Sequence, residues 1–213
     1  MAEMIRVLQA DDHAVVRQGY RRLLETRHDI TIVGEAATAR EAFTQYQLLE
    51  PDVLVLDLGL PDMGGVELIS RLRQRHAQAR ILVFTMHREP VFATQALRAG
   101  ALGYVTKSSP PDFLVDAVYR VAARRQVISP EIASELALAL IDRTNEALDQ
   151  LSPREFEILR LLLDGCGAED IGARLSITAK TVHNYHYQIK DKLGVRSDIE
   201  LTRAAIRLGL IRA

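Results

Sequence analysis

The chain has 213 residues, 48% of them hydrophobic and 26% charged, which is the composition of a folded globular protein with one large or two small domains. Its single cysteine, Cys166, excludes an internal disulfide framework and a zinc site made of CxxC pairs. The apolar runs fall short of the roughly 18 residues that a membrane span needs, and no basic stretch precedes a hydrophobic one at the N-terminus. We therefore expect a protein of the reducing cytoplasm.

The net charge of −1 divides unevenly along the chain. Residues 1–150 carry 17 Lys+Arg against 20 Asp+Glu, whereas residues 151–213 carry 10 against 8. This asymmetry indicates two parts with different tasks.

In the first 125 residues, short runs rich in β-branched residues alternate with amphipathic stretches. The apolar runs predict five strands, at 4–10, 30–36, 52–57, 80–85 and 103–106, and each intervening segment is long enough for one helix. This alternation predicts an α/β fold with a parallel sheet covered on both faces, because parallel neighbours need crossover connections. Right-handed crossovers bring the carboxyl ends of all strands to one edge, where such sheets bind their ligands.

Four of the five predicted strands end in a side chain capable of polar chemistry. Asp11 and Asp12 follow the first strand, Asp57 ends the third, Thr85 ends the fourth, and Lys107 follows the fifth. Three carboxylates at one edge repel one another unless a cation lies among them, and Mg²⁺ prefers oxygen ligands of this kind. A carboxylate beside Mg²⁺ can also act as a nucleophile and form an aspartyl phosphate, whose oxygens Thr85 and Lys107 would contact.

Each of these residues also has a purely structural interpretation. Asp12 suits the N-cap of a helix that starts near His13, and Asp57 suits the turn formed by the following GLPDMGG. Thr85 and Lys107 are residue types common at surfaces and sheet edges. Their joint placement at strand ends favours the chemical interpretation.

Residues 126–150 predict a helical linker. Ser129 suits the N-cap and Pro130 the first helical position, and an apolar stripe follows at Ile132, Leu136 and Leu140. The polar stretch 144–150 favours a flexible connection. A contact between domains or between two copies is the alternative role of this helix.

Residues 151–213 predict an all-helical domain. The segment LSPREFEIL begins a helix with a capping box of Ser152 and Glu155, and SDIE at 197–200 begins the last helix with a second one. Between them, we expect a short helix at 168–175, a tight turn, and a longer helix at 179–193 that Gly194 ends. This succession is typical of a helix-turn-helix, whose second helix enters the major groove of DNA.

The second helix of that motif has two faces. Its apolar positions, Val182, Tyr185 or His186, Ile189 and Leu193, recur at helical spacing and are expected to face the core. The candidate DNA contacts lie on the polar face: Lys180, Thr181, His183, Asn184, Tyr187 and Lys190. Asparagine can pair with adenine, lysine meets guanine or phosphate, and a tyrosine hydroxyl reaches phosphate. A merely solvated face is the alternative.

The strand-end residues, with AGALGYVTK ahead of Lys107, resemble the receiver domain of bacterial two-component response regulators over residues 4–124. The resemblance implies a flavodoxin-like fold with strand order 2-1-3-4-5 and Asp57 as the phosphoacceptor. It implies that Asp12, Asp57 and the main-chain carbonyl of Gly59 bind Mg²⁺, with Asp11 close by or acting through water.

The same resemblance implies that Thr85 and Lys107 contact the phosphoryl group and that the side chain of Tyr104 follows Thr85 as a switch. A simple packing role is the alternative for Tyr104. The surface that moves would then be residues 88–104. The chain departs from many receivers at Ser108, where they carry a proline after the lysine.

The segments LSPREFEIL and KTVHNYHYQIKDKLGV resemble the LuxR-type helix-turn-helix over residues 150–210. The whole chain thus resembles a NarL/FixJ response regulator and, within that family, the GacA/UvrY branch. We expect a receiver at 1–125, a helical linker at 126–150 and a DNA-binding domain at 151–213, whose last helix, near 199–208, pairs two domains. Gly172 stands where the family usually keeps alanine, which implies a helix weaker by about 1 kcal/mol.

The resemblance implies a transcription regulator without an enzymatic activity of its own. A sensor histidine kinase or a phosphotransfer protein would phosphorylate Asp57, and the altered receiver would control binding of a homodimer to double-stranded DNA. Two other functions stay open. An aspartyl phosphatase typically needs a second acid two residues on, where this chain has Gly59, and a phosphorylation-independent regulator would use its receiver only for dimerisation.

Overall fold

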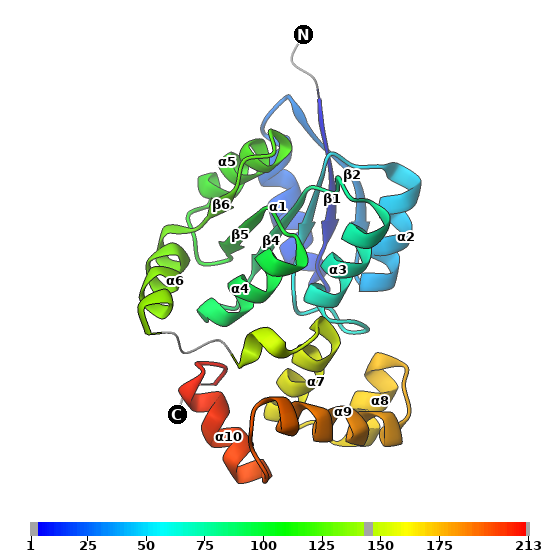
Figure 1. The fold of residues 1–213 in the computed structure, drawn as a ribbon. Coiled ribbons are helices and arrows are strands. Elements are labelled where there is room, and N and C mark those ends of the chain that lie inside the picture. Colours follow the sequence, from blue (N-terminus) through cyan, green and yellow to red (C-terminus); the bar gives the residue numbers. More distant parts are fainter. Residues whose placement is uncertain (1–3, 143–146, 212–213) are drawn as a thin grey trace. The chain divides into compact units, whose positions relative to one another are not determined.

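The computed structural model describes residues 4–142 and 147–211 (Figure 1). Backbone contacts divide the chain into two units, Met1–Arg88 with Ala96–Pro130, and Glu89–Gln95 with Glu131–Ala213. Within the described residues, no helix has both the length and the apolar character that crossing a membrane requires.

The first unit contains a parallel sheet with the strand order β2-β1-β3-β4-β5-β6. The strands are β1 (Ile5–Ala10), β2 (Ile30–Ala36), β3 (Val53–Leu56), β4 (Ile81–Thr85), β5 (Gly103–Thr106) and β6 (Val127–Ile128). The parallel α/β fold and the order 2-1-3-4-5 are confirmed. The prediction of only five strands was wrong, because β6 has two residues and is too short to show a sequence period; it lies at the start of the expected linker and pairs with Gly103 and Tyr104.

Helices cover both faces of the sheet. They are α1 (Ala14–Glu25), α2 (Ala39–Leu49), α3 (Gly65–Arg75) and α5 (Pro111–Ala122), whereas the first residues of α4 (Pro90–Ala99) are assigned to the second unit. Apolar side chains of α1 and α5, among them Leu24, Leu114 and Val118, join strand residues in one buried core, and α2 and α3 pack together on the other face (Figure 1). Because every strand runs the same way, the carboxyl ends of β1, β3, β4 and β5 share one edge.

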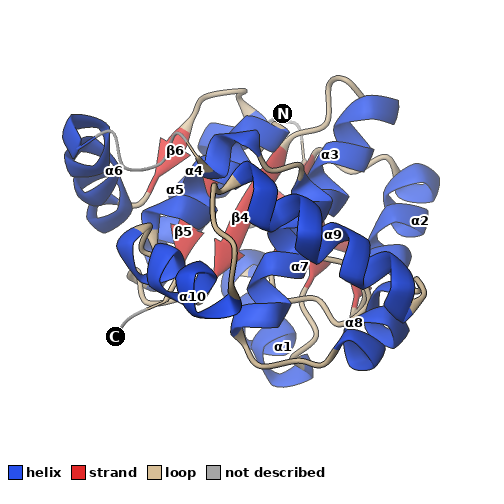
Figure 2. Cartoon of the chain, turned by 60° about the horizontal axis from the view of Figure 1, so that its bottom comes forward, coloured by secondary structure: helices blue, strands red, loops and turns tan. Residues whose placement is uncertain are grey.

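The α-helices of the second unit begin where the sequence predicted. They are α6 (Pro130–Asp142), α7 (Pro153–Leu163), α8 (Ala168–Leu175), α9 (Ala179–Lys192) and α10 (Asp198–Arg207), and the 3₁₀ turn η1 (Leu148–Gln150) precedes α7. Helix α9 ends one residue before the predicted position 193. Helices α8 and α9 are neighbours and form the expected helix-turn-helix (Figure 2). Gly194, with φ 67°, follows the end of α9 as predicted.

The two predicted capping boxes differ in detail. Ser152 and Glu155 form a complete one, since each side chain accepts the other residue's backbone N–H. Ser197 likewise accepts the N–H of Glu200, but the Glu200 carboxylate accepts the N–H of Arg196 at 2.7 Å, one residue earlier than the box requires. Helix α10 still begins where SDIE predicted.

Helix α6, the predicted linker helix, begins at Pro130 as predicted, although the Ser129 hydroxyl does not cap it. The Ser129 Oγ is buried and has no hydrogen-bond partner among the described residues. Ile132 is buried and Leu136 half-buried, whereas the side chain of Leu140 lies outside the described part of the chain, as do residues 144–146 of the polar stretch.

A close backbone approach explains the glycine at position 172. A Cβ on Gly172 would lie 2.7 Å from the carbonyl oxygen of Ile177, in the turn between α8 and α9. The turn would have to move to admit even a methyl group. The close packing that glycine allows here therefore offsets the helix propensity that is lost relative to alanine.

Candidate functional site

Three strands deliver the central residues of the site to one edge of the sheet. The N–H of Asp11 donates to Ala36 O, the N–H of Asp57 to Ala10 O, and the N–H of Lys107 to Thr85 O, at 2.8 to 3.0 Å. The sheet hydrogen bonds therefore continue up to the functional residues. This holds their Cα atoms as rigidly as the strands themselves.

Lys107 lies between two of the three carboxylates. Its Nζ is 2.6 Å from Asp11 Oδ2 and 2.6 Å from Asp57 Oδ2, and all three side chains are between 5% and 8% exposed. Burial by itself lowers the pKa of Lys107, but the Asp57 and Asp11 carboxylates outweigh it and the pKa lies above its ordinary value. Lys107 is consequently a fixed positive charge at neutral pH.

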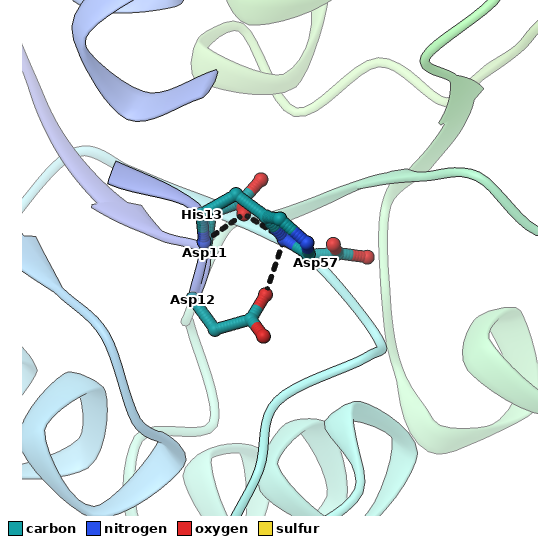
Figure 3. A group of neighbouring side chains, drawn as sticks. All are labelled: Asp11, Asp12, His13 and Asp57. Carbon is teal, nitrogen blue, oxygen red and sulfur yellow. Dashed lines mark hydrogen bonds and ion pairs between the residues drawn. The ribbon is translucent and has the colours of Figure 1, made fainter. Parts of the chain in front are cut away.

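Asp12 is not the N-cap of α1, contrary to its structural interpretation. The N-cap is His13, and the N–H of His13 donates to Asp11 Oδ1 at 2.9 Å. Asp12, one-third exposed, instead directs Oδ1 to within 2.6 Å of His13 Nδ1 (Figure 3). The Asp12 carboxylate is thus not used to start the helix.

The four polar side chains drawn in Figure 3 are close enough to bind one cation. One ligand atom each from Asp11, Asp12, His13 and Asp57 lies within 4.8 Å of all the others. Three ionised carboxylates and the Lys107 ammonium leave a net charge of −2, which a single divalent ion would neutralise. Carboxylate oxygens at this spacing suit a hard cation.

Asp57 also has the turn role that its sequence context suggested. The N–H of Gly59 donates to Asp57 Oδ1 at 3.3 Å, which leaves Oδ2 for Lys107. The structural and the chemical interpretations of Asp57 are therefore compatible.

Thr85 and Tyr104 lie on the neighbouring strands of the same sheet. Thr85 is 1% exposed, and its hydroxyl accepts the N–H of His87 at 3.5 Å. Tyr104 is fully buried, and its hydroxyl donates to His87 O at 3.1 Å. Both side chains are therefore connected to the loop that follows β4.

Hydroxyl groups on either side of Lys107 form hydrogen bonds with one another. Thr106 Oγ1 lies 2.9 Å from Ser108 Oγ and 3.1 Å from Ser109 Oγ. Ser108, which replaces the proline of many receivers, thus takes part in a hydrogen-bonded cluster next to the lysine.

The sequence did not point to two further residues of this edge. His13 shares the acidic cluster, and Arg17 donates from Nη1 to Asp11 O at 2.5 Å while its Nε lies 3.4 Å from Glu35 Oε2. The only signal for Arg17 was its position one helical turn after His13, which places it on the same side of α1.

Helix α9, the second helix of the helix-turn-helix and the predicted recognition helix, presents its polar residues largely as predicted. Val182 and Ile189 are buried, Leu193 is half-buried, and Tyr185 and His186 are both intermediate, so neither alternative for the core position is fully inside. Lys180, His183, Asn184 and Tyr187 are exposed, with Tyr187 at 73%, and Thr181 is partly exposed near Thr178.

Lys190 differs from the other candidate DNA contacts. Its Nζ lies 3.1 Å from Asp198 Oδ1, which also lies 3.0 Å from His186 Nε2. The hydrogen bond from Lys190 holds the pKa of Asp198 below its ordinary value, so this carboxylate stays charged beside the end of α9.

Comparisons with known proteins cover nearly the whole chain. Residues 7–119 match the family "Response regulator receiver domain", and residues 149–205 match "Bacterial regulatory proteins, luxR family". The response regulator UvrY of Escherichia coli is 35% identical over 212 residues, which cover 99% of this chain and 97% of UvrY. The response regulator GacA of Pseudomonas viridiflava is 38% identical over 213 residues, 99% of each chain.

Solved structures that resemble this chain are also response regulators. A LuxR-family response regulator from Aurantimonas is 47% identical, with a TM-score of 0.64, and covers 65% of this chain and 99% of its own. RcsB from Salmonella enterica serovar Typhimurium, solved on a promoter with the phosphomimetic BeF3⁻, is 27% identical, with a TM-score of 0.71, and covers 97% of this chain and 99% of its own. The chain therefore belongs to the two-component response regulators, transcription regulators that join a receiver domain to a LuxR-type DNA-binding domain.

Proposed function

We propose that Asp57 is the phosphoacceptor of this response regulator and that its phosphorylation controls DNA binding by the helix-turn-helix. One observation supports this assignment most: the buried Asp57 carboxylate lies 2.6 Å from Lys107, beside two further carboxylates. A purely structural site would not gather three like charges at a sheet edge, because their mutual repulsion costs free energy.

In the proposed reaction, one Asp57 oxygen attacks phosphorus as the bond to the donor breaks. The donor is a phosphohistidine of a sensor histidine kinase or phosphotransfer protein, so an O–P bond forms and a P–N bond is cleaved. Lys107 remains protonated and neutralises charge on the phosphoryl oxygens, which a flexible surface lysine would do less well. The Thr85 hydroxyl provides a further hydrogen bond to that group.

The donor set fits Mg²⁺. Asp11, Asp12 and Asp57, with the main-chain carbonyl of Gly59, would hold the ion, which would supply positive charge to the phosphoryl oxygens when bound. The remaining net charge of −2 supports a divalent ion over a monovalent one.

Phosphorylation would add about −1.5 to −2 charges next to Lys107 and Thr85. The Thr85 hydroxyl would leave the N–H of His87 for the phosphoryl group, and Tyr104, which contacts the same residue, would respond. Residues 88–104 are then the surface whose two states differ.

We divide the chain into a receiver at 1–125, a helical linker at 126–150 and a DNA-binding domain at 151–213. Lys180, Thr181, His183, Asn184, Tyr187 and Lys190 would contact DNA. RcsB has been solved on promoters and as two dimers on parallel DNAs. By this likeness we propose a cytoplasmic homodimer on double-stranded DNA, paired through α10, where Ile199 and Ile206 are exposed two turns apart on one face.

The test is labelling of the full chain by a small phosphodonor such as acetyl phosphate, with and without Mg²⁺. We expect acid-labile phosphate to be incorporated only with Mg²⁺ and to be absent in Asp57→Asn. Asp112→Asn, at a side chain 87% exposed, is the matched control. Persistent labelling of Asp57→Asn would remove Asp57 from this role, and DNA binding indifferent to labelling would favour a receiver that only dimerises.

A further inference from the structure

A nitrogen donor lies inside the acidic cluster. His13 Nδ1 is 2.6 Å from Asp12 Oδ1 and 3.4 Å from Asp11 Oδ1, and Figure 3 shows its ring directed at these carboxylates. The proposed Mg²⁺ site uses oxygen atoms only. The imidazole is therefore an additional donor for which the phosphorylation chemistry has no use.

The fold does not need this ring. The side chain of His13 is 67% exposed, and at the N-cap of α1 it makes no capping hydrogen bond. The backbone of His13 carries the local structure instead, since its N–H donates to Asp11 Oδ1 and its carbonyl accepts the N–H of Arg17. The ring can thus change partner without cost to the helix.

The spacing suits coordination. Ligands about 2.1 Å from one ion lie about 3 Å apart when adjacent and about 4.2 Å apart when opposite. The four ligand atoms lie within 4.8 Å of one another, and the 3.4 Å between His13 Nδ1 and Asp11 Oδ1 is close to an adjacent pair. Asp12 and His13, the two exposed members, can each move by a few tenths of an ångström, so they can adjust to an ion while Asp11 and Asp57 stay at the sheet edge.

We propose that His13 Nδ1 is a ligand of this site for ions that bind nitrogen, namely Mn²⁺, Co²⁺ and Zn²⁺, and that Mg²⁺ does not recruit it. Mg²⁺ demands oxygen ligands and keeps several waters, whereas imidazole suits the later divalent ions. His13 adds a donor without adding charge, so it changes which ion is preferred while the net charge of −2 stays the same. The proposal rests on the metal site proposed above.

Pulsed electron paramagnetic resonance of the full chain with MnCl₂ tests the proposal directly. We expect coupling of Mn²⁺ to a ¹⁴N nucleus in the wild-type protein, and its loss in His13→Asn and His13→Ser. Both replacements are favoured N-cap residues, so α1 is expected to form in each variant. His28→Asn, at an exposed histidine outside the cluster, is the matched control and is expected to keep the coupling.

A titration gives the second readout. The dissociation constants of Co²⁺ and Mg²⁺ are measured by competition between the two ions, in wild-type protein and in both His13 variants. We expect the preference for Co²⁺ over Mg²⁺ to fall by about tenfold or more in the variants. Mn²⁺ bound without ¹⁴N coupling, or an unchanged preference, would overturn the role of His13 alone. Failure of the wild-type chain to bind either ion would instead overturn the metal site and, with it, the proposed function.

Discussion

The two functional surfaces of this regulator place their charges in opposite ways. At the sheet edge, Asp11, Asp57 and Lys107 are at most 8% exposed and bind one another. On the recognition helix, Lys180, His183 and Asn184 are exposed. Buried charges need counter-charges within the protein because removing them from water costs free energy. Exposed charges stay hydrated and need no counter-charge in the unbound protein. The receiver edge is therefore preorganised, whereas we expect the helix face to gain its counter-charges only when DNA binds.

The largest expected effect comes from breaking the buried group. Lys107→Met keeps the length of the side chain and removes its charge, which leaves two buried carboxylates unpaired. We expect the free energy of unfolding, measured by urea denaturation in EDTA, to fall by about 3 kcal/mol and Mg²⁺ to restore part of it. Lys180→Met, at an exposed lysine, is the control. Equal stabilities of the two variants would mean that the burial of Lys107 carries no energetic weight.

The recognition helix is expected to respond in binding rather than in stability. Lys180→Ala is predicted to weaken binding to duplex DNA by about 1 kcal/mol and to lower the slope of log affinity against log salt by about 0.9, the value for one lost phosphate contact. Lys190→Ala is predicted to have the smaller effect, since Asp198 already offsets its charge. Fluorescence anisotropy over a range of salt concentrations measures both. Unchanged slopes in both variants would argue against phosphate contacts.

The pair of Glu155 and Lys192 lies between the two extremes, because the Glu155 side chain is buried and that of Lys192 is partly exposed. Burial raises the pKa of Glu155, but hydrogen bonds from Lys192 and Ser152 outweigh it and hold the pKa below its ordinary value. A carboxyl group with a lowered folded-state pKa stabilises the fold above its unfolded pKa, and this contribution is lost as the pH falls through the folded pKa.

Glu155→Gln keeps a capping-box residue and removes only the charge. We expect a loss of about 1 kcal/mol at pH 7 that shrinks as the pH falls below about 4.3, the ordinary pKa of glutamate. Thermal unfolding at several pH values checks this, with Glu169→Gln on the exposed first turn of α8 as the control. A difference that is constant with pH would assign the effect to the hydrogen bonds and not to the charge.

The sequence by itself determined what depends on local chemistry. Apolar runs marked β1 to β5, Ser152 with Glu155 marked the start of α7, and Asp57 and Lys107 at strand ends marked the edge that carries the site. These features were predictable because period, caps and strand direction act over a few residues, and a parallel sheet then sends all strand ends to one side.

Only the tertiary structure decided the features that depend on how the chain folds back on itself. The pairing of β6 with β5 could not be predicted from two residues, nor could the approach of Ile177 to Gly172 or the pairing of Lys190 with Asp198. The ring of His13 was placed in the acidic cluster by the path of the chain after β1. In each case the partner is chosen by packing in three dimensions, and no local preference of either residue specifies it.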